Sequence, residues 1–222
     1  MQVERVLIPS QAGGVPAVVI APPAPSGAVV LAHGYGGCKE EQMGFGWRIA
    51  ETGLAVCVID WRGHGENPHE FDRSIGEDID AAVDYCRQFG RVAAVGHSIG
   101  GRAALTSSAD FTIALSPGLP RQYGRQTHLA LRNLRCHRVR PASLDVLLDA
   151  LDTMPVWHPN SGKPALIIYG SRDLIEIVDA CRTLKAAGEP VVEIEGALHM
   201  DIYLTESVFA TVNDKLREWF GR

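Results

Sequence analysis

Residues 92–101 read Val-Ala-Ala-Val-Gly-His-Ser-Ile-Gly-Gly, and this stretch says more about the fold than any other part of the chain. Its apolar first residues predict a buried strand, and the small residues at 102–108 favour a helix. Ser98 would then lie at a sharp strand-to-helix turn, where side chains two residues to either side would collide, so glycine is needed there. The pattern predicts a nucleophile elbow, which exposes the serine hydroxyl and points free helical N–H groups at any anion formed beside it.

Length and composition predict one globular domain over residues 1–222. The chain is 46% hydrophobic and 21% charged, and its net charge of −5 gives no reason to expect a nucleic-acid partner. No apolar run approaches membrane-spanning length and the amino terminus lacks a signal-peptide pattern, so we expect no membrane partner and a cytoplasmic location. The five cysteines are widely spaced without a Cys-x-x-Cys motif, which favours reduced thiols over a disulfide framework or a zinc site.

Strand patterns alternate with helix patterns along most of the chain. Two β-rich runs, 3–8 and 15–21, flank Gln11-Ala12-Gly13-Gly14 and predict an antiparallel hairpin. Further strands are predicted at 28–32, 56–59, 92–95, 111–115, 165–169 and 191–194, and helices at 40–52, 75–89, about 177–184 and about 208–220. Such alternation implies a mostly parallel sheet with helices on both faces, in which ligands bind at the carboxyl ends of the strands.

The exception to this alternation is a long segment, about 118–163, between the strands at 111–115 and 165–169. It contains its own predicted helix, in which Ser143 is the N-cap and leucines recur at helical spacing from Leu144 to Leu151. Because an insertion at the strand ends lies over the binding edge of the sheet, we expect this segment to form a small cap.

A serine hydroxyl needs a base to remove its proton, and the base needs a third group to hold it in the right tautomer. Asp173 follows the strand at 165–169, and His199 follows the strand at 191–194. The order Ser98, Asp173, His199 is the one expected for this type of elbow. We therefore predict that these three residues form a catalytic triad.

Other histidines and carboxylates are less well placed. Glu176 lies inside a predicted helix, and His158 lies in the cap segment. His97 adjoins the serine but is expected to point to the other side of the turn, and His33 and His64 are interpreted as hydrogen-bonding loop residues.

A group at residues 64–70 offers potential metal ligands in His64, Glu66, His69 and Glu70. Pro68 interrupts the group, and the triad already accounts for hydrolysis. We therefore predict no metal site.

The oxyanion of a tetrahedral intermediate needs two N–H donors, one from the residue after the nucleophile and one from a loop after an earlier strand. Ile99 and Tyr35 occupy those two places. The glycines beside Tyr35 would let the backbone come close to the substrate, and Gly34 is the neighbouring candidate for a substrate contact.

The elbow resembles that of the α/β-hydrolase superfamily. Four further features are similar to this superfamily: His-Gly-Tyr-Gly-Gly at 33–37, Asp-Trp-Arg-Gly-His-Gly at 60–65, the Gly-x-x-Asp that ends at Asp173, and His199. The chain is most similar to the small esterase, lipase-like and serine-peptidase-like members, over nearly its whole length outside the cap. The resemblance implies an eight-stranded α/β-hydrolase fold and a cofactor-free reaction through an acyl-enzyme. The serine at the elbow argues against the dehalogenase and epoxide hydrolase branches, which use aspartate there.

The cap is unusual in its charge. Residues 121–140 contain six arginines and no acidic residue, whereas residues 66–84 contain seven carboxylates and one arginine. One explanation is a solvated cap, or charge pairing between cap and body. The other is that cap arginines, with Arg125 as the candidate, hold a carboxylate or phosphate of the substrate.

These observations favour a serine hydrolase that cleaves a carboxylic ester of a small or medium acyl substrate. An acyl thioesterase or a small peptidase would use the same residues, because the resemblance does not identify a substrate. A non-catalytic binding protein with this fold is the alternative from another class, and it has no need of the whole set of catalytic residues.

Overall fold

Eight strands form one sheet in the computed structural model, which describes residues 1–10, 13–120, 122–159 and 162–221. Their order across the sheet is β1-β2-β4-β3-β5-β6-β7-β8. Their bounds are β1 Gln2–Ile8, β2 Val15–Ala21, β3 Ala28–Ala32, β4 Ala55–Ile59, β5 Val92–His97, β6 Phe111–Leu115, β7 Ala165–Arg172 and β8 Val191–Leu198. Every neighbouring pair from β4 to β8 is parallel, so the predicted sheet is confirmed.

The amino-terminal strands form the antiparallel part of the sheet. β1 pairs with β2 along its whole length, and β2 pairs in turn with β4. The predicted hairpin is therefore confirmed, while Gln11 and Ala12 of its turn lie outside the described residues.

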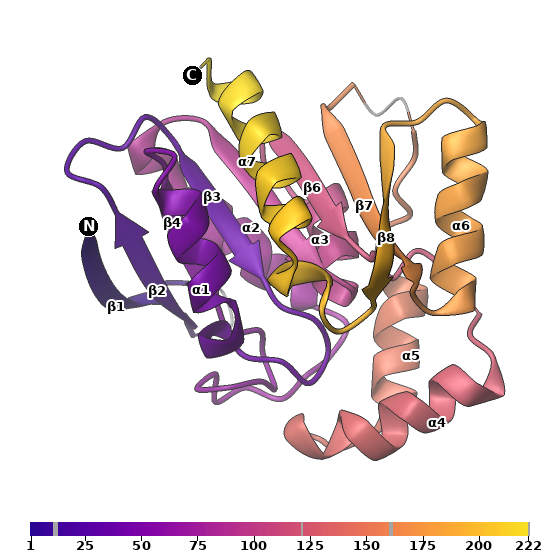
Figure 1. Ribbon diagram of the computed structural model, residues 1–222. Helices are drawn as coiled ribbons and strands as arrows, with labels where there is room; N and C mark the ends of the chain where they lie inside the picture. The colour runs from indigo at the N-terminus through magenta and orange to yellow at the C-terminus, as the bar shows by residue number, and fades with distance from the viewer. Residues whose placement is uncertain (11–12, 121, 160–161, 222) are drawn as a thin grey trace.

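Helices cover both faces of the sheet, as predicted. The helices are α1 Lys39–Ala50, α2 Ile75–Cys86, α3 Ile99–Thr106, α4 Arg125–Leu134, α5 Leu144–Thr153, α6 Ile175–Ala186 and α7 Glu206–Phe220, with short 3-10 turns at Arg87–Phe89, Cys136–Arg138 and Ile202–Leu204. One face packs against α1 and α7, which lie in front of the sheet in Figure 1. The other face packs against α2, α3 and α6. Because helices cover both faces, strands such as β3, β4, β5 and β6 are buried throughout.

Two strands extend further than their apolar runs indicated. β7 ends at Arg172 and not at residue 169, and β8 ends at Leu198 and not at residue 194. The two strands pair with each other through a bulge near Gly170, and their last residues are mostly polar and exposed. The extension places Asp173 and His199 directly after the strand ends.

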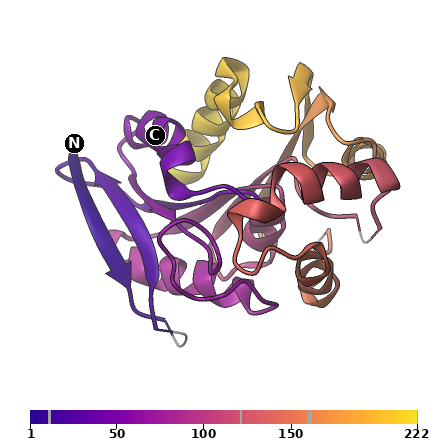
Figure 2. The same cartoon turned by 90° about the horizontal axis from the view of Figure 1, so that it is seen from below.

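The cap segment, residues 118–163, lies between β6 and β7 and contains two helices, α4 and α5, where one was predicted. The predicted N-cap of α5 is confirmed, because the Ser143 hydroxyl accepts a hydrogen bond from the Val146 N–H. α4 was missed because its sequence is mostly polar and it buries one of its ten residues, Thr127. Seen from below in Figure 2, α4 lies across the end of the sheet.

None of the helices in the described part of the chain combines the length and the apolar character needed to cross a membrane. The five cysteines are free thiols, of which four are buried.

Candidate active site

Ser98 sits between β5 and α3 with a left-handed backbone, φ 57° and ψ −118°. A Cβ atom on Gly96 would lie 2.1 Å from the carbonyl oxygen of Gly100, and one on Gly100 would lie 2.5 Å from the carbonyl oxygen of His33. Such contacts are impossible, so the turn can form only with glycine at both positions. The strained serine costs about 1–3 kcal/mol, and the surrounding backbone holds it through a hydrogen bond from its N–H to Leu115.

The three predicted triad residues lie together at the carboxyl ends of β5, β7 and β8. Nε2 of His199 lies 3.1 Å from Oγ of Ser98, and Nδ1 lies 2.7 Å from Oδ1 of Asp173. The carboxylate can only accept, so Nδ1 carries the proton and Nε2 is free to accept the proton of the serine hydroxyl. This is the arrangement that a general base requires.

The Asp173 carboxyl group remains ionised although it is buried. Burial alone would raise its pKa, but the hydrogen bond and charge of His199 outweigh burial, and the pKa lies below its ordinary value. The Leu174 N–H also donates to Oδ1 at 2.6 Å. Ser116, which follows β6 and has φ 46°, also lowers the pKa of Asp173, although no hydrogen bond between the two side chains is present among the described residues. The sequence analysis did not single out Ser116, because its place near Asp173 depends on the pairing of β6 with β7.

His97 was expected to point away from the site, and this is wrong. Its ring packs against that of His199 with centroids 4.9 Å apart, and its Nε2–H donates to the His199 carbonyl oxygen at 2.8 Å. The loop after β8 folds back over the end of β5, which brings the two rings together. His97 thus helps to hold the loop that carries the general base.

The two candidate oxyanion donors face the same site from opposite sides. The N–H of Ile99 is the first of α3, and that of Tyr35 lies in the loop after β3. Neither N–H donates a hydrogen bond to any residue of the described ranges. The Tyr35 hydroxyl lies 3.2 Å from the Ser143 carbonyl oxygen, so this residue also contacts the cap.

Gly34 lets this loop approach the nucleophile. A Cβ atom on Gly34 would lie 3.1 Å from Cβ of Ser98 and 2.8 Å from Nδ1 of His97. The residue therefore lies beside the reacting groups, as its candidate role requires.

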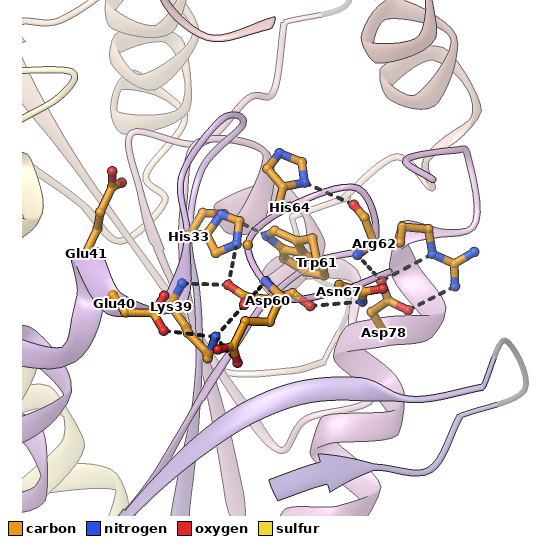
Figure 3. Close-up of polar contacts among 12 residues, drawn as sticks. His33, Lys39, Glu40, Glu41, Asp60, Trp61, Arg62, His64, Asn67 and Asp78 are labelled. Atoms are coloured by element: carbon orange, nitrogen blue, oxygen red, sulfur yellow. Dashed lines mark hydrogen bonds and ion pairs between the residues drawn. The ribbon is translucent and has the colours of Figure 1, made fainter. Parts of the chain in front are cut away.

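A buried ion pair anchors the loop that carries Tyr35 (Figure 3). Nζ of Lys39 lies 2.6 Å from Oδ2 of Asp60, and the Lys39 N–H donates to Oδ1 at 2.7 Å. Both side chains are almost completely buried. Burial alone would lower the pKa of Lys39, but hydrogen bonds to Asp60, Glu66 and Glu40 raise it above its ordinary value, so the lysine stays charged.

His33 and His64 support the same loop, in agreement with their interpretation as hydrogen-bonding residues. Nε2 of His64 accepts the Gly36 N–H at 3.0 Å, and its Nδ1–H donates to the Arg62 carbonyl oxygen. The Trp61 indole N–H donates to the His33 carbonyl oxygen at 2.8 Å. These bonds join the loop after β4 to the loop after β3, and Figure 3 shows the side chains of His33, Trp61 and His64 that lie between them.

The potential metal ligands of residues 64–70 are engaged separately. His64 is buried against Gly36, whereas Glu66 binds Lys39 and Arg5. Within residues 1–10, 13–120, 122–159 and 162–221, no group of three or more His, Cys, Asp or Glu side chains is placed to hold a metal ion.

Three buried histidines predict acid instability. Burial is the main cause that lowers the pKa of His33 to about 4 and those of His64 and His97 to about 3. Unfolding returns each to about 6.5, so below that pH the unfolded chain binds more protons than the folded chain. The contribution of the three histidines to the free energy of unfolding is fully present above pH 6.5 and is lost as the pH falls towards 4. Over that range the free energy of unfolding should fall by about 4 kcal/mol per pH unit for three groups.

Urea unfolding between pH 4.5 and 7.5 would measure this slope. His97→Gln should reduce it by about a third, whereas His158→Gln in the cap should leave it unchanged. A free energy of unfolding that stays constant from pH 7.5 to 4.5 would contradict the prediction.

Two small hollows flank Ser98 under the cap, each with a volume of about 30 Å³. The apolar hollow is lined by Leu131, Leu147, Leu151, Leu174 and Ile177 together with Ile99, Tyr123 and others. The polar hollow is lined by Gln42, Arg135, Glu41 and Tyr203 together with Gly34, His97 and others. Ser98, His199, Tyr35 and Leu131 belong to both hollows, and most of the exposed lining of each is apolar. What distinguishes the polar hollow is that the charged side chains of Glu41 and Arg135 line it.

The structure places the cap arginines differently from one another. Arg125 begins α4, is exposed and lines neither hollow. Arg138 pairs with Glu41 of the body at 2.6 Å, which is the charge pairing between cap and body that was one alternative. The arginine that reaches the site is Arg135, directly after α4.

The acidic stretch at 66–84 turns mainly towards the body. Asp72, Glu77 and Asp78 bind Arg62, which is itself almost completely buried. Among the cap arginines that the structure describes, none forms an ion pair with a carboxylate of this stretch.

The strand order and the elbow bring Ser98, His199 and Asp173 together at one edge of the α/β sheet. A match to the model of the Alpha/beta hydrolase family covers residues 29–159, which is more than half of the chain. The chain belongs to this family. No curated protein matches the sequence.

Solved structures resemble the chain over nearly its whole length. The match to an esterase of Pyrobaculum calidifontis covers 99% of this chain and 85% of the esterase chain, at 20% identity and a TM-score of 0.66. The alpha/beta hydrolase GrgF from Penicillium sp. sh18 covers 100% of both chains, at 15% identity and a TM-score of 0.78. Est1E from Butyrivibrio proteoclasticus, with ferulic acid bound, covers 98% of this chain and 100% of its own, at 21% identity and a TM-score of 0.75. These likenesses confirm the predicted fold class.

Proposed function

We propose that the protein is a serine hydrolase that cleaves a carboxylic ester of a small or medium acyl group through an acyl-enzyme. One observation carries the proposal: His199 bridges the Ser98 hydroxyl and the buried Asp173 carboxylate, with Nε2 free to accept a proton. A binding protein has no need of a strained serine held against a general base. The esterases among the similar solved structures support an ester as the substrate class.

The residues perform the first half of the reaction as follows. Oγ of Ser98 attacks the ester carbonyl carbon while its proton passes to Nε2 of His199, and Asp173 stabilises the imidazolium that forms. The oxyanion accepts hydrogen bonds from the N–H groups of Tyr35 and Ile99, each worth about 10² to 10³ in turnover. His199 then gives its proton to the alcohol oxygen, the carbon–oxygen bond breaks, and the acyl group stays on Ser98.

Water completes the cycle. It attacks the acyl carbonyl carbon while His199 removes its proton, and the same N–H groups hold the second oxyanion. The intermediate collapses, Ser98 regains its proton from His199, and the carboxylic acid leaves. The reaction uses only groups of this chain and water.

The size and lining of the apolar hollow support a small or medium acyl group. The leucines of the cap and of the β7–α6 connection surround a space of about 30 Å³ beside Ser98. Burial of a hydrocarbon group there gains about 0.8 kcal/mol for each CH₂. A longer chain would have to displace the cap.

A fluorophosphonate probe tests whether Ser98 is an activated nucleophile. We expect wild-type protein to be labelled and Ser98→Ala not to be, because the phosphorus reacts only with a serine whose proton a base can accept. Ser207→Ala, at an exposed serine of α7, is the matched control and should be labelled like the wild type. Absence of labelling in folded wild-type protein would overturn the proposal in favour of a binding protein.

An acyl thioesterase and a small peptidase would use the same triad. Rates on p-nitrophenyl esters of increasing chain length, compared with acyl-CoA thioesters and a peptide p-nitroanilide, separate the three. We expect kcat/KM to be highest for a short ester.

The cytoplasmic location stays a prediction, which fractionation of the cells that make the protein would test.

A further inference from the structure

Arg135 directly follows α4 and presents a cation to the polar hollow beside Ser98. Its backbone packs so closely on the oxyanion loop that a Cβ atom on Gly36 would lie 2.9 Å from the Arg135 carbonyl oxygen. This packing holds the start of the side chain at the edge of the site. The backbone of Arg135 is therefore held against the oxyanion loop.

The contacts of this guanidinium group are weak. Nη1 lies 3.4 Å from the Gly36 carbonyl oxygen, and Nη2 lies 3.1 Å from Sδ of Met200. No carboxylate of the described ranges lies within ion-pair distance of it. The buried cations of the body differ, since Lys39 and Arg62 each contact three carboxylates.

Gln42 of α1 lines the same hollow and is 1% exposed. Its side-chain Oε1 has no hydrogen-bond partner among the described residues. A buried polar atom without a partner is costly, and Oε1 can only accept, so it would be stabilised by a donor group of a ligand, such as a hydroxyl, and not by a carboxylate oxygen.

Glu41 also lines the hollow, and its charge is the one that opposes an anion there. Arg138 neutralises it through an ion pair of 2.6 Å. The remaining charge among Glu41, Arg135 and Arg138 is positive. The hollow therefore favours an anionic ligand.

We propose that the polar hollow is a binding subsite for a carboxylate carried by the substrate, with Arg135 as its charged ligand. The inference rests on the proposed function and deepens it: the substrate would be an ester that bears a free carboxylate a few bonds from the reacting carbonyl. The small volume fits a carboxylate, and a guanidinium group binds one through two parallel hydrogen bonds. The sequence analysis named Arg125 for this function, but its position outside both hollows makes it the natural control.

Two pairs of matched esters test the subsite with the charge on either side of the reacting carbonyl. The first pair is the p-nitrophenyl hemiester of succinic acid against p-nitrophenyl butyrate. The second is 4-acetoxybenzoate against its methyl ester. We expect wild type to prefer the anionic member of at least one pair, and Arg135→Gln to reduce this preference in kcat/KM about tenfold, as loss of one charge-assisted contact would.

Arg125→Gln, at the other end of α4, should leave the preference unchanged. Arg135→Lys should retain part of it, because the charge remains while the paired hydrogen-bond geometry is lost. Raising the salt concentration should weaken the wild-type preference, because the hollow is open to solvent at its mouth.

The opposite results would overturn the inference. They are a wild-type enzyme that prefers the neutral ester of both pairs, or an Arg135→Gln variant that slows anionic and neutral esters equally. The second result would mean that Arg135 only supports Gly36. Failure of the proposed function looks different, since the wild type would then hydrolyse neither ester and would not react with the fluorophosphonate. If Arg135→Gln does not fold, the wild-type preference and Arg135→Lys still decide the question.

Discussion

Replacement of Ser98 by alanine is expected to lower kcat for ester hydrolysis on the order of 10⁶-fold. The change removes the only atom that attacks the carbonyl carbon, while the oxyanion donors Tyr35 and Ile99 and both hollows stay in place. Those remaining groups should still give a rate about 10³-fold to 10⁴-fold above that of water. Steady-state kinetics on p-nitrophenyl acetate, with enzyme concentration set by fluorophosphonate titration of the wild type, would measure the loss.

His199→Ala should cause a loss of similar size, because Ser98 without its base is a poor nucleophile. The double variant should be no slower than either single variant, since the two groups act as one unit. The Ser207→Ala control should retain full activity. A reduction of less than 100-fold in Ser98→Ala protein that is free of wild-type contamination would show that another group attacks the substrate.

Replacement of Asp60 by alanine is expected to lower the free energy of unfolding by about 3 to 5 kcal/mol, the effect of removing one partner of a buried ion pair. Lys39 would keep its charge in a buried position, with only the half-exposed Glu40 and Glu66 beside it. The N–H groups of Lys39 and Glu66 would also lose the oxygens that accept them. Urea unfolding at pH 7.5 would measure the change.

The double variant Asp60→Asn, Lys39→Met is the sharper control. The asparagine oxygen still accepts a backbone N–H, and the methionine removes the buried charge without leaving a cavity. We expect it to recover most of the stability that Asp60→Ala loses. A loss below 1 kcal/mol in Asp60→Ala would mean that the pair is not an anchor of the loop after β3.

The parts of the site that the sequence predicted are those that local rules determine. Gly96 and Gly100 are needed because any Cβ there would meet the backbone, and this crowding can be read from a window of ten residues. The positions of Asp173 and His199 follow from strands that end at one edge of a parallel sheet. The hydrophobic runs predicted the bounds of β3, β4 and β6 to within a residue.

The parts that the sequence did not predict depend on contacts between distant segments. Arg135 and Arg125 belong to the same arginine-rich run, and only the path of the chain after α4 places one at the site and leaves the other exposed. The contact of His97 with His199 joins residues 102 positions apart. The polar sequence of α4 gave little sign of a helix, because it packs few apolar residues against the body.

Tyr35 joins the loop after β3 to the cap. Its backbone N–H faces the reaction, while its phenol oxygen bonds to the residue at the start of α5. If a long acyl chain displaced α5, we would expect the Tyr35 side chain to move with it and the proposed oxyanion donor to shift. Under the proposed function, an ester with too long an acyl group would then show a lower kcat as well as weaker binding.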